Sequence, residues 1–537
     1  MRVSDPNLLS RDWFTQNTLQ YHVLFTWLTS TLMKLHLLKA GFLVGYLACV
    51  IVMHVSWLGI VRKMGGSIAA YLFSVTIFHA SGGGFGLGMF QFLQDGSFLP
   101  SNIASALTLA GIYFWLDRRE IFAGVCIGIA GIFHLNYALI AILAWTVLAG
   151  LDAWRDRALT KLFRPKAIIT ALLVLIPCSI NILNAATSKW NHSAKIPLDD
   201  FVQFYCYFRH PHHYAPMTWP ISLWISFLWP IPLATYAFWI APPTEEQKKL
   251  GRIFVFILAL LVFAFFTAGA FFVAETFIQM SLWRFSIFAK LISCVAVAWL
   301  VIDYWKWPLR KISVVAFVIA LAILISALVP IPANFGGFIE THRATFYAGA
   351  ALIALLGFFY AFATSRFKPA TLVVGLIALT VIIPSALAGK LGLNPFDDEP
   401  KEMIELATWC RANTPVDSLF VVPPSDSAFR LSARRSAVVS FKQVPQLNGE
   451  LIEWKRRLDD VLGTDVSKLR GQMPEMMRKM DDLYRERSPS ELLEIASHYD
   501  ANYVVSLRDL GPQFSSLNVY TTSSGAYRLY RVPTEAR

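Results

Sequence analysis

Charge is scarce in this 537-residue chain: Asp, Glu, Lys and Arg make up 15% of it, whereas 56% of the residues are hydrophobic. An ordinary soluble domain carries a larger charged fraction, so composition alone argues against that class. The six cysteines show no CxxC or Cys/His spacing, which excludes a zinc finger or ribbon. No internal repeat and no low-complexity tract is visible, which argues against a repeat protein.

Long apolar runs recur over the first 390 positions, and each is long enough to cross ~30 Å of hydrocarbon as a helix. In lipid, every backbone N–H and C=O must be satisfied within the segment, so these runs predict helices. We predict a polytopic bundle of about twelve. They cover approximately 38–61, 67–84, 99–116, 120–135, 137–153, 167–186, 219–241, 252–273, 283–304, 312–332, 344–364 and 369–388.

Basic residues divide unevenly between the alternating connections of this bundle. One set carries seventeen: Arg62, Lys63, Arg118, Arg119, Arg155, Arg157, Lys161, Arg164, Lys166, Lys248, Lys249, Arg252, Lys306, Arg310, Lys311, Arg366 and Lys368. The other carries nine over longer loops: Arg2, Arg11, Lys34, Lys39, Lys189, Lys195, Arg209, Arg284 and Arg343. Cytoplasmic loops are enriched in Lys and Arg, so the first set is predicted to be cytoplasmic. The net charge of +12 then reflects topology and not nucleic-acid binding.

The composition changes after residue 390, where an acidic, proline-marked stretch precedes a soluble pattern. Short apolar strands such as "SLFVVPP" and "NYVVSL" alternate with amphipathic helices such as "ELIEWKRRLDDVLG". We therefore predict three regions. Residues 1–37 form an outer N-terminal segment with an interfacial helix at 19–36, residues 38–389 form the bundle, and residues 397–537 form a small α/β domain on the outer, periplasmic side.

The N-terminus has no basic-then-apolar signal sequence. A chain that starts outside the membrane without a leading helix is unusual. We therefore expect a start that is truncated or that lies downstream of a first helix.

Polar and ionisable residues gather on the predicted outer side, at the ends of the apolar runs. They are Asp12, His79, His134, Asn136, Arg209, His210, His212, His213, Glu275, Arg284, His342 and Arg343. Ionisable residues at membrane depth suggest a functional site. The alternative is that these residues are polar only because they lie in outer loops exposed to water. Lys290, inside the ninth run, is expected to reach the outer rim or to mark a transport pathway. The cluster Arg430, Arg434, Arg435 and Lys442 is expected to be a solvated face, with contact to an acidic glycan or headgroup as the alternative.

Several stretches resemble known families. "LLSRDWF", followed by the 19–36 helix, the bundle and the outer domain, resembles the GT-C superfamily of polytopic glycosyltransferases that use polyprenyl-phosphate sugars. "FRHPHHYAPMTW" and "NTPVDSLFVVPPSDSAFRLSARRSAVVSFK" are more closely similar to an uncharacterised bacterial membrane family with a domain of unknown function. The chain departs from the superfamily pattern in two ways: it lacks a first transmembrane helix, and it lacks an Asp-x-Asp pair. Because that pair would bind a metal ion, no metal cofactor is expected.

The superfamily resemblance implies roles for the outer residues. Asp12 matches the base that takes the acceptor proton, with a plain helix-capping aspartate as the alternative. Arg209 would bind the leaving phosphate through two parallel hydrogen bonds, and Arg284 and Arg343 are alternative candidates for this role. For His210, His212 and His213 three interpretations stay open: contact with the phosphate or sugar, structural hydrogen bonding of the loop, or a divalent metal site.

Three functions are compatible with this pattern. The leading hypothesis is a glycosyltransferase of the bacterial inner membrane that moves a sugar from a polyprenyl-phosphate donor to a glycan or lipid acceptor at the outer face. A non-catalytic scaffold of envelope polysaccharide synthesis is the alternative. A transporter is less favoured, because the sequence shows no two related halves with broken helices.

The charge asymmetry makes the topology testable by labelling with a membrane-impermeant maleimide. A cysteine introduced at Ser488 should react from outside in intact cells, whereas one at Lys161 should react only after the membrane is opened. The reverse pattern would invert the topology and remove the outer site.

Overall fold

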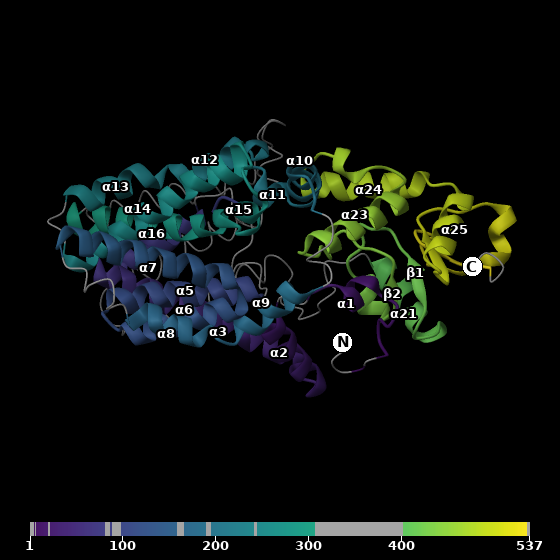
Figure 1. Cartoon of the computed structure of the whole chain (residues 1–537), viewed down its shortest axis with the longest axis horizontal. Coiled ribbons are helices and arrows are strands. Elements are labelled where there is room, and N and C mark those ends of the chain that lie inside the picture. The colour runs from purple at the N-terminus through teal and green to yellow at the C-terminus, as the bar shows by residue number, and fades with distance from the viewer. Residues whose placement is uncertain are drawn as a thin grey trace. The chain divides into compact units, whose positions relative to one another are not determined.

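The computed structural model describes residues 5, 7–19, 22–80, 86–88, 98–157, 166–188, 195–240, 244–306 and 401–533. The chain divides into two compact units. One unit comprises Leu37–Ser179 and Pro216–Leu393 and is called here the helical unit. The other, the α/β unit, comprises Met1–His36, Ile180–Ala215 and Asn394–Arg537 (Figure 1).

Helices occupy every predicted apolar run up to residue 304. They are α3 (Leu38–Lys63), α4 (Ile68–Ala80), α5 (Pro100–Leu116), α6 (Glu120–Phe133), α7 (Leu135–Arg155), α8 (Lys166–Val174), α9 (Cys178–Thr187), α12 (Ile221–Leu228), α13 (Pro230–Ile240), α14 (Glu245–Phe265), α15 (Glu275–Gln279) and α16 (Ser286–Trp299). Short 3₁₀ and π turns join them: η5 (Pro216–Thr218), η6 (Phe266–Ala270), η7 (Leu282–Phe285) and η8 (Leu300–Tyr304).

Four helical stretches in the described residues are long and apolar enough to cross a membrane: Leu38–Lys63, Leu135–Arg155, Glu245–Ala270 and Glu275–Tyr304. The predicted runs 312–332, 344–364 and 369–388 lie outside the described residues. The count of twelve therefore stays a prediction.

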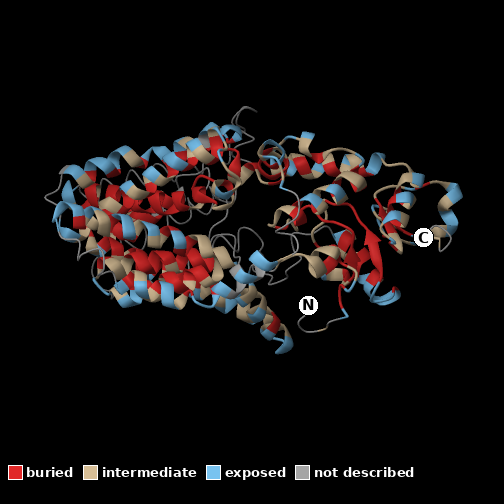
Figure 2. Ribbon diagram, in the orientation of Figure 1, coloured by how far each residue is buried: buried red, intermediate tan, exposed pale blue. Residues whose placement is uncertain are grey.

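The helical unit packs around α16, every residue of which is buried. Helices α4, α13 and α14 contact it. Figure 2 shows buried residues on the faces that the helices of this unit turn toward one another and exposed residues on the outward faces. Several outward side chains are large and apolar, including Trp154 and Trp239, which are 81% and 84% exposed. An apolar outer surface of this kind suits contact with lipid.

Helix α6 approaches α8 closely because its contact face carries Gly124 and Gly128. A Cβ at Gly124 would collide with the carbonyl oxygen of Ala167, and one at Gly128 would collide with Val174. Small residues at such contacts let membrane helices come together, since lipid provides no hydrophobic drive for their association.

One predicted helix, 167–186, is broken in the structure. Helix α8 ends at Val174, and α9 begins at Cys178. Pro177 lies in the break, where it removes a backbone donor and its ring obstructs the preceding turn. The prediction of one uninterrupted helix there is wrong because hydropathy does not register this interruption.

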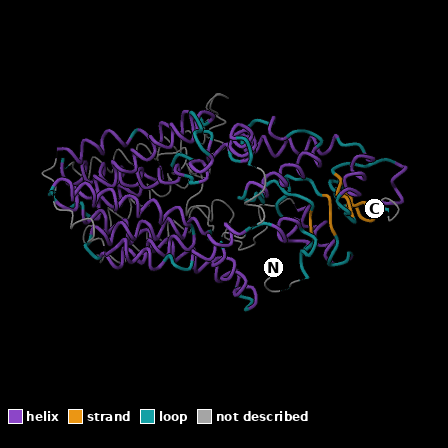
Figure 3. Tube along the Cα trace, viewed as in Figure 1, coloured by secondary structure: helices purple, strands orange, loops and turns teal. Residues whose placement is uncertain are grey.

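The α/β unit contains a five-stranded sheet of order β2-β1-β3-β5-β4. Its strands are β1 (Leu419–Val421), β2 (Ser436–Ala437), β3 (Tyr503–Ser506), β4 (Asn518–Thr521) and β5 (Arg528–Arg531). Strands β2, β1 and β3 are parallel, and β5 pairs antiparallel with both β3 and β4. The predicted strand segments "SLFVVPP" and "NYVVSL" contain β1 and β3. Figure 3 draws the strands in orange.

Helices alternate with these strands. They are α21 (Lys401–Asn413), α22 (Phe429–Ala433), α23 (Asn448–Leu462), α24 (Met473–Glu486) and α25 (Pro489–His498), with the 3₁₀ turns η10 (Val466–Lys468) and η11 (Pro512–Leu517). Helix α25 begins with a capping box, in which the Ser488 hydroxyl accepts from the backbone N–H of Glu491. A buried cluster that includes Leu406, Phe420 and Leu529 forms the core beside the sheet.

Two segments remote in sequence also belong to the α/β unit. The N-terminal segment contributes α1 (Trp13–Asn17) and α2 (Val23–Lys34), and the middle segment contributes α10 (Leu198–Phe201), η4 (Val202–Arg209) and α11 (Pro211–Tyr214). Helix α2 lies inside the predicted 19–36 helix, and its Trp27 side chain is exposed.

Side-chain bonds tie the N-terminal segment to the C-terminal part of the unit. Arg11 donates to Asn502 at 2.9 Å and pairs with Asp500 at 2.6 Å. The fully buried Glu450 accepts from the backbone N–H of Leu19 at 2.8 Å. The predicted domain 397–537 is therefore completed by chain from outside that range.

These ties predict that residues 397–537 expressed alone are less stable than the same fragment carrying residues 5–36 on a flexible linker. The linked segment restores partners to buried groups such as Glu450, and a buried polar group left unpaired costs about 1–3 kcal/mol. Thermal unfolding followed by circular dichroism checks this. A linked segment of scrambled sequence is the control, and equal unfolding temperatures for all three proteins would contradict the prediction.

Candidate functional site

The "FRHPHHY" loop begins in a π-helix, η4, which ends at Arg209. The backbone N–H of His210 donates to the carbonyl of Tyr205, five residues earlier, at 3.0 Å. Such helices are rare and concentrate at functional sites, because the extra residue per turn redirects side chains. Phe208, near the end of η4, is buried and packs against Phe441, with 5.1 Å between the two ring centroids.

Arg209 lies against the segment that follows β2. Its Nη2 donates to the carbonyl oxygen of Lys442 at 3.0 Å, and its guanidinium lies 4.7 Å from the centre of the Phe441 ring. Its Nη1 lies 3.5 Å from Nδ1 of His210. The side chain is 8% exposed, and its Nε is buried without a hydrogen-bond partner among the described residues.

Arg209 is therefore a buried cation without a carboxylate counter-ion among the described residues. No carboxylate of the described residues lies within ion-pair distance of it, and burial lowers its pKa to about 10. It remains protonated at neutral pH, since that pKa is still well above 7. A buried charge is costly unless it is paired, so this guanidinium favours an anionic ligand.

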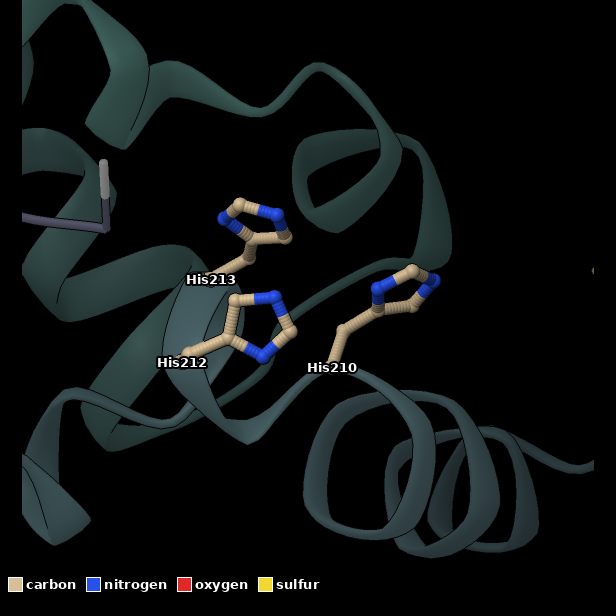
Figure 4. Close-up of side chains that lie close together, drawn as sticks. All are labelled: His210, His212 and His213. Carbon is tan, nitrogen blue, oxygen red and sulfur yellow. The ribbon is translucent and has the colours of Figure 1, made fainter. Parts of the chain in front are cut away.

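His210, His212 and His213 lie together. Each offers a ring nitrogen, and the three nitrogen atoms all lie within 4.8 Å of one another (Figure 4). The rings are half-buried, and His210 packs against Tyr205 and Tyr214 at centroid distances of 4.9 and 5.6 Å. The structure therefore brings Arg209 and all three histidines of the predicted site into one place.

Asp12, the predicted base, is fully buried, and both its carboxylate oxygens are occupied. Oδ1 accepts from the backbone N–H and the hydroxyl of Thr15 at 2.9 and 2.8 Å, which caps α1. Oδ2 accepts from Nε of Arg430 and from the backbone N–H of Ala437. A carboxylate has about four acceptor sites, so these four bonds leave no free lone pair for an acceptor proton.

The catalytic role of Asp12 stays a prediction, but its partners favour the capping alternative and a structural ion pair. The contacts also connect it with Arg209. Arg430 donates onward from Nη1 to the side chain of Gln443, whose neighbour Lys442 accepts from Arg209. Asp12 and Arg209 thus hold the same stretch of chain after β2 without a bond between them.

A second group of predicted residues meets in the helical unit. Arg284, in η7, donates from Nη1 to Nε2 of His134 at 2.8 Å, so that ring nitrogen carries no proton. Asn136, at the start of α7, donates to the carbonyl oxygen of Met280 at 3.0 Å. Glu275, at the start of α15, accepts from Gln279 at 2.8 Å. Like Arg209, Arg284 has no carboxylate partner within the described part of the chain.

The remaining predicted residues are not placed as a site. His79 lies in α4, and nothing is described of its side chain. His342 and Arg343 lie outside the described residues. Lys290 is buried in α16 and donates to the hydroxyl of Ser226 at 2.9 Å.

Sequence reasoning missed the structural use of two arginines in the predicted basic cluster. Arg430 and Arg435 are both only 6% exposed, so the expected solvated face is wrong for them. Arg435 donates to the carbonyl oxygens of Thr414 and Arg411, and Arg430 pairs with Asp12. No local signal in the sequence could show the second pairing, because the two residues are 418 positions apart.

The buried ion pair predicts a stability defect that does not depend on catalysis. Asp12→Asn should destabilise the full chain by ~3–5 kcal/mol, because it leaves Arg430 as an uncompensated buried charge. Thermal unfolding in detergent measures this. Asp500→Asn, which removes the exposed ion pair with Arg11, is the matched control and should cost less than about 1 kcal/mol. An Asp12→Asn protein that unfolds at the wild-type temperature would show that the pair is not structural.

Comparisons with known proteins agree with this architecture. Residues 401–461 match a family described as a domain of unknown function, DUF6798. No curated protein matches the chain. The crystal structure of ArnT from Cupriavidus metallidurans bound to undecaprenyl phosphate is similar over 99% of this chain and 93% of that one, with a TM-score of 0.51 and 14% identity. Its apo structure is similar over the same shares, with a TM-score of 0.47 and 13% identity. The chain therefore has the fold of that ArnT structure, and residues 401–461 match a domain of unknown function.

Proposed function

We propose that this protein is an integral membrane glycosyltransferase of the GT-C type. It takes a sugar from a polyprenyl-phosphate donor and transfers it to a glycan or lipid acceptor at the outer face of the bacterial inner membrane. The proposal includes a bundle of about twelve spans, with the α/β unit outside. The observation that carries it is Arg209, a buried guanidinium without a carboxylate partner among the described residues.

The chemistry of the leaving group explains why an arginine of this kind fits. A departing polyprenyl phosphate is already a weak base, so it needs positive charge and N–H donors more than it needs a proton. The guanidinium binds phosphate oxygens in a fixed fork, and a site with little water strengthens that attraction. The ArnT structure was obtained with undecaprenyl phosphate bound, which supports a lipid phosphate as the ligand class.

Arg284 supplies a second guanidinium of the same kind in the helical unit. Its bond to His134 fixes its orientation, while its Nε has no hydrogen-bond partner among the described residues. We infer that it is a second candidate group for binding an anion, considered within the helical unit alone. His134, which accepts from Arg284, and Asn136, which donates to the carbonyl oxygen of Met280, would then hold this loop in place.

The superfamily resemblance implies Asp12 as the base, yet all its acceptor sites are occupied. Glu275 is a carboxylate near Arg284 in sequence, and it begins α15 with a bond to Gln279. We propose that Asp12 positions the α/β unit, and that Glu275 is the first carboxylate to test for proton transfer.

A scaffold without catalysis is the second candidate, and the occupied carboxylate of Asp12 is the observation that favours it. Such a protein would still bind the lipid phosphate but would release no product. Lipid binding and turnover must therefore be measured separately.

The test uses the full chain in nanodiscs and a fluorescent polyprenyl phosphate. Arg209→Gln should weaken binding at least tenfold, since a hydrogen bond to a charged group contributes about 1.5–3 kcal/mol. Arg478→Gln, on the exposed face of α24, is the matched control and should bind as wild type. Unchanged binding by Arg209→Gln would remove the phosphate site.

Release of polyprenyl phosphate from a polyprenyl-phosphate sugar, with an envelope extract as acceptor, then separates the two candidates. Wild-type release that Glu275→Gln abolishes, with lipid binding intact, supports the enzyme. Binding without release by the wild-type protein supports the scaffold.

A further inference from the structure

The three parallel strands of the α/β unit end at a common edge of the sheet. Strand β1 lies between β2 and β3, and all three run in the same direction (β1 and β2 are labelled in Figure 1). The chain leaves β1 toward β2 on one side, whereas it leaves β3 toward β4 and β5 on the other. Open α/β sheets bind ligands outside the carboxyl ends of their strands, at the point where the connections diverge in this way. The side chains at this edge decide which ligand it suits.

A hydroxyl group and a lysine follow β1 and β2. The two segments after these strands lie together, since the backbone N–H of Phe441 donates to the carbonyl oxygen of Pro424 at 2.8 Å. In the same two segments, Nζ of Lys442 donates to the hydroxyl of Ser427 at 3.1 Å. Lys442 is exposed, and no carboxylate within the described ranges lies at ion-pair distance from its ammonium group. The ends of β1 and β2 therefore present an ammonium group beside a hydroxyl.

Helix α24 connects the end of β1 with the end of β3. Its Asp481 accepts from the hydroxyl of Ser425, in the loop after β1. One turn along the helix, the carbonyl oxygen of Arg485 accepts from Nε of Arg508, which follows β3, at 2.8 Å. Arg508 also donates to the carbonyl oxygen of Arg487 at 3.0 Å, and it has no carboxylate partner in the part of the chain that the structure describes. A carboxylate, a hydroxyl and a second cation thus lie at the ends of β1 and β3.

This combination suits a saccharide that carries an acidic group. Sugar hydroxyls both donate and accept hydrogen bonds, so they match a carboxylate beside serine hydroxyls. A carboxylate or phosphate on the sugar would supply the partner that the two cations lack, through charge-assisted hydrogen bonds. Neighbouring strands lie about 4.8 Å apart, so three strand ends extend over roughly 10 Å, which is long enough for more than one sugar ring. Both serines, Asp481 and Arg508 are half-buried, which limits their motion and leaves them accessible.

We propose that the carboxyl edge of the sheet, formed by Ser425, Ser427, Lys442, Asp481 and Arg508, binds an acidic saccharide. Asp481 and the serines bind sugar hydroxyls, whereas Lys442 and Arg508 bind the acidic group. The inference rests on the proposed function only where it names this saccharide as the acceptor. It also gives a role to the domain of unknown function, since the match at 401–461 contains both serines and Lys442.

The test measures saccharide binding to the full chain in nanodiscs of neutral lipid, with no polyprenyl-phosphate donor present. The probe is a tetrasaccharide of mannuronic acid, and mannotetraose is its neutral counterpart. Titration calorimetry should show that the acidic probe binds at least tenfold more tightly, because its carboxylates add charge-assisted contacts that the neutral sugar cannot make.

Variants assign the binding to this edge. Lys442→Gln and Arg508→Gln should each weaken binding of the acidic probe at least threefold. For the neutral probe, on which charge repulsion does not act, Asp481→Ala should weaken binding at least threefold. Arg531→Gln is the matched control and should bind as wild type. Arg531 is an exposed cation in β5 and lies opposite Tyr503, at the start of β3 and therefore at the other edge of the sheet.

Unfolding temperatures show whether the variants are folded, and Lys442→Gln decides if the others are not, because Lys442 is exposed. The inference is overturned if the wild-type protein binds the two tetrasaccharides equally, or if Lys442→Gln binds the acidic one as wild type. Equal competition by tetraglutamate would also overturn it, since the edge would then be a peptide-binding surface.

The outcome is separable from that of the proposed function. Saccharide binding without release of polyprenyl phosphate would reject the transferase, and with it the name of acceptor, but not the site. Release of polyprenyl phosphate by a protein that binds neither tetrasaccharide would reject the site alone.

Discussion

The α/β unit depends on the burial of one ion pair, Asp12 with Arg430. The two residues are 6% exposed or less. Burying either charge without the other would cost a large free energy of desolvation. The pair forces the N-terminal segment to lie against the chain around β2, since only there does Arg430 find its carboxylate and Asp12 its further donor, the backbone N–H of Ala437. Helix α1 starts at this point because Asp12 is also its N-cap.

This constraint explains why the unit is assembled from three separated parts of the chain. Arg430 and Arg209 both bind the stretch of chain after β2. Arg430 donates to the side chain of Gln443, and Arg209 donates to the backbone carbonyl of Lys442. The loop with the histidines is therefore positioned by contacts inside the α/β unit. Phe208 adds apolar packing to these polar contacts. Its ring centroid lies 6.4 Å from that of Trp454, and its ring also packs against Phe441.

Hydropathy predicted the helical class and most helix positions, because a run of apolar residues determines a membrane helix locally. It missed the break at Pro177 and the π-helix at 202–209, both of which depend on backbone hydrogen bonds rather than on side-chain polarity. The strands and the capping box at Ser488 were predictable for the same local reason. The site was predictable only in part. Arg209 and the histidines adjoin in sequence, whereas the partner of Asp12 lies 418 positions away.

The contrast between Arg430 and Arg209 decides which arginine is available for a ligand. Both are buried, and both donate to the stretch after β2, yet only Arg430 has a carboxylate within the described residues. A paired guanidinium is already neutralised, so a ligand would have to displace Asp12 to gain its charge. Arg209 keeps a full positive charge, because its pKa of about 10 is lowered by burial but stays above neutrality. Fold similarity at 14% identity supplies no such distinction, since it fixes the course of the chain and not the state of each charge. The expected ligand chemistry therefore follows from the lack of a carboxylate partner among the described residues: an anion at Arg209, for which a lipid phosphate is the proposed ligand.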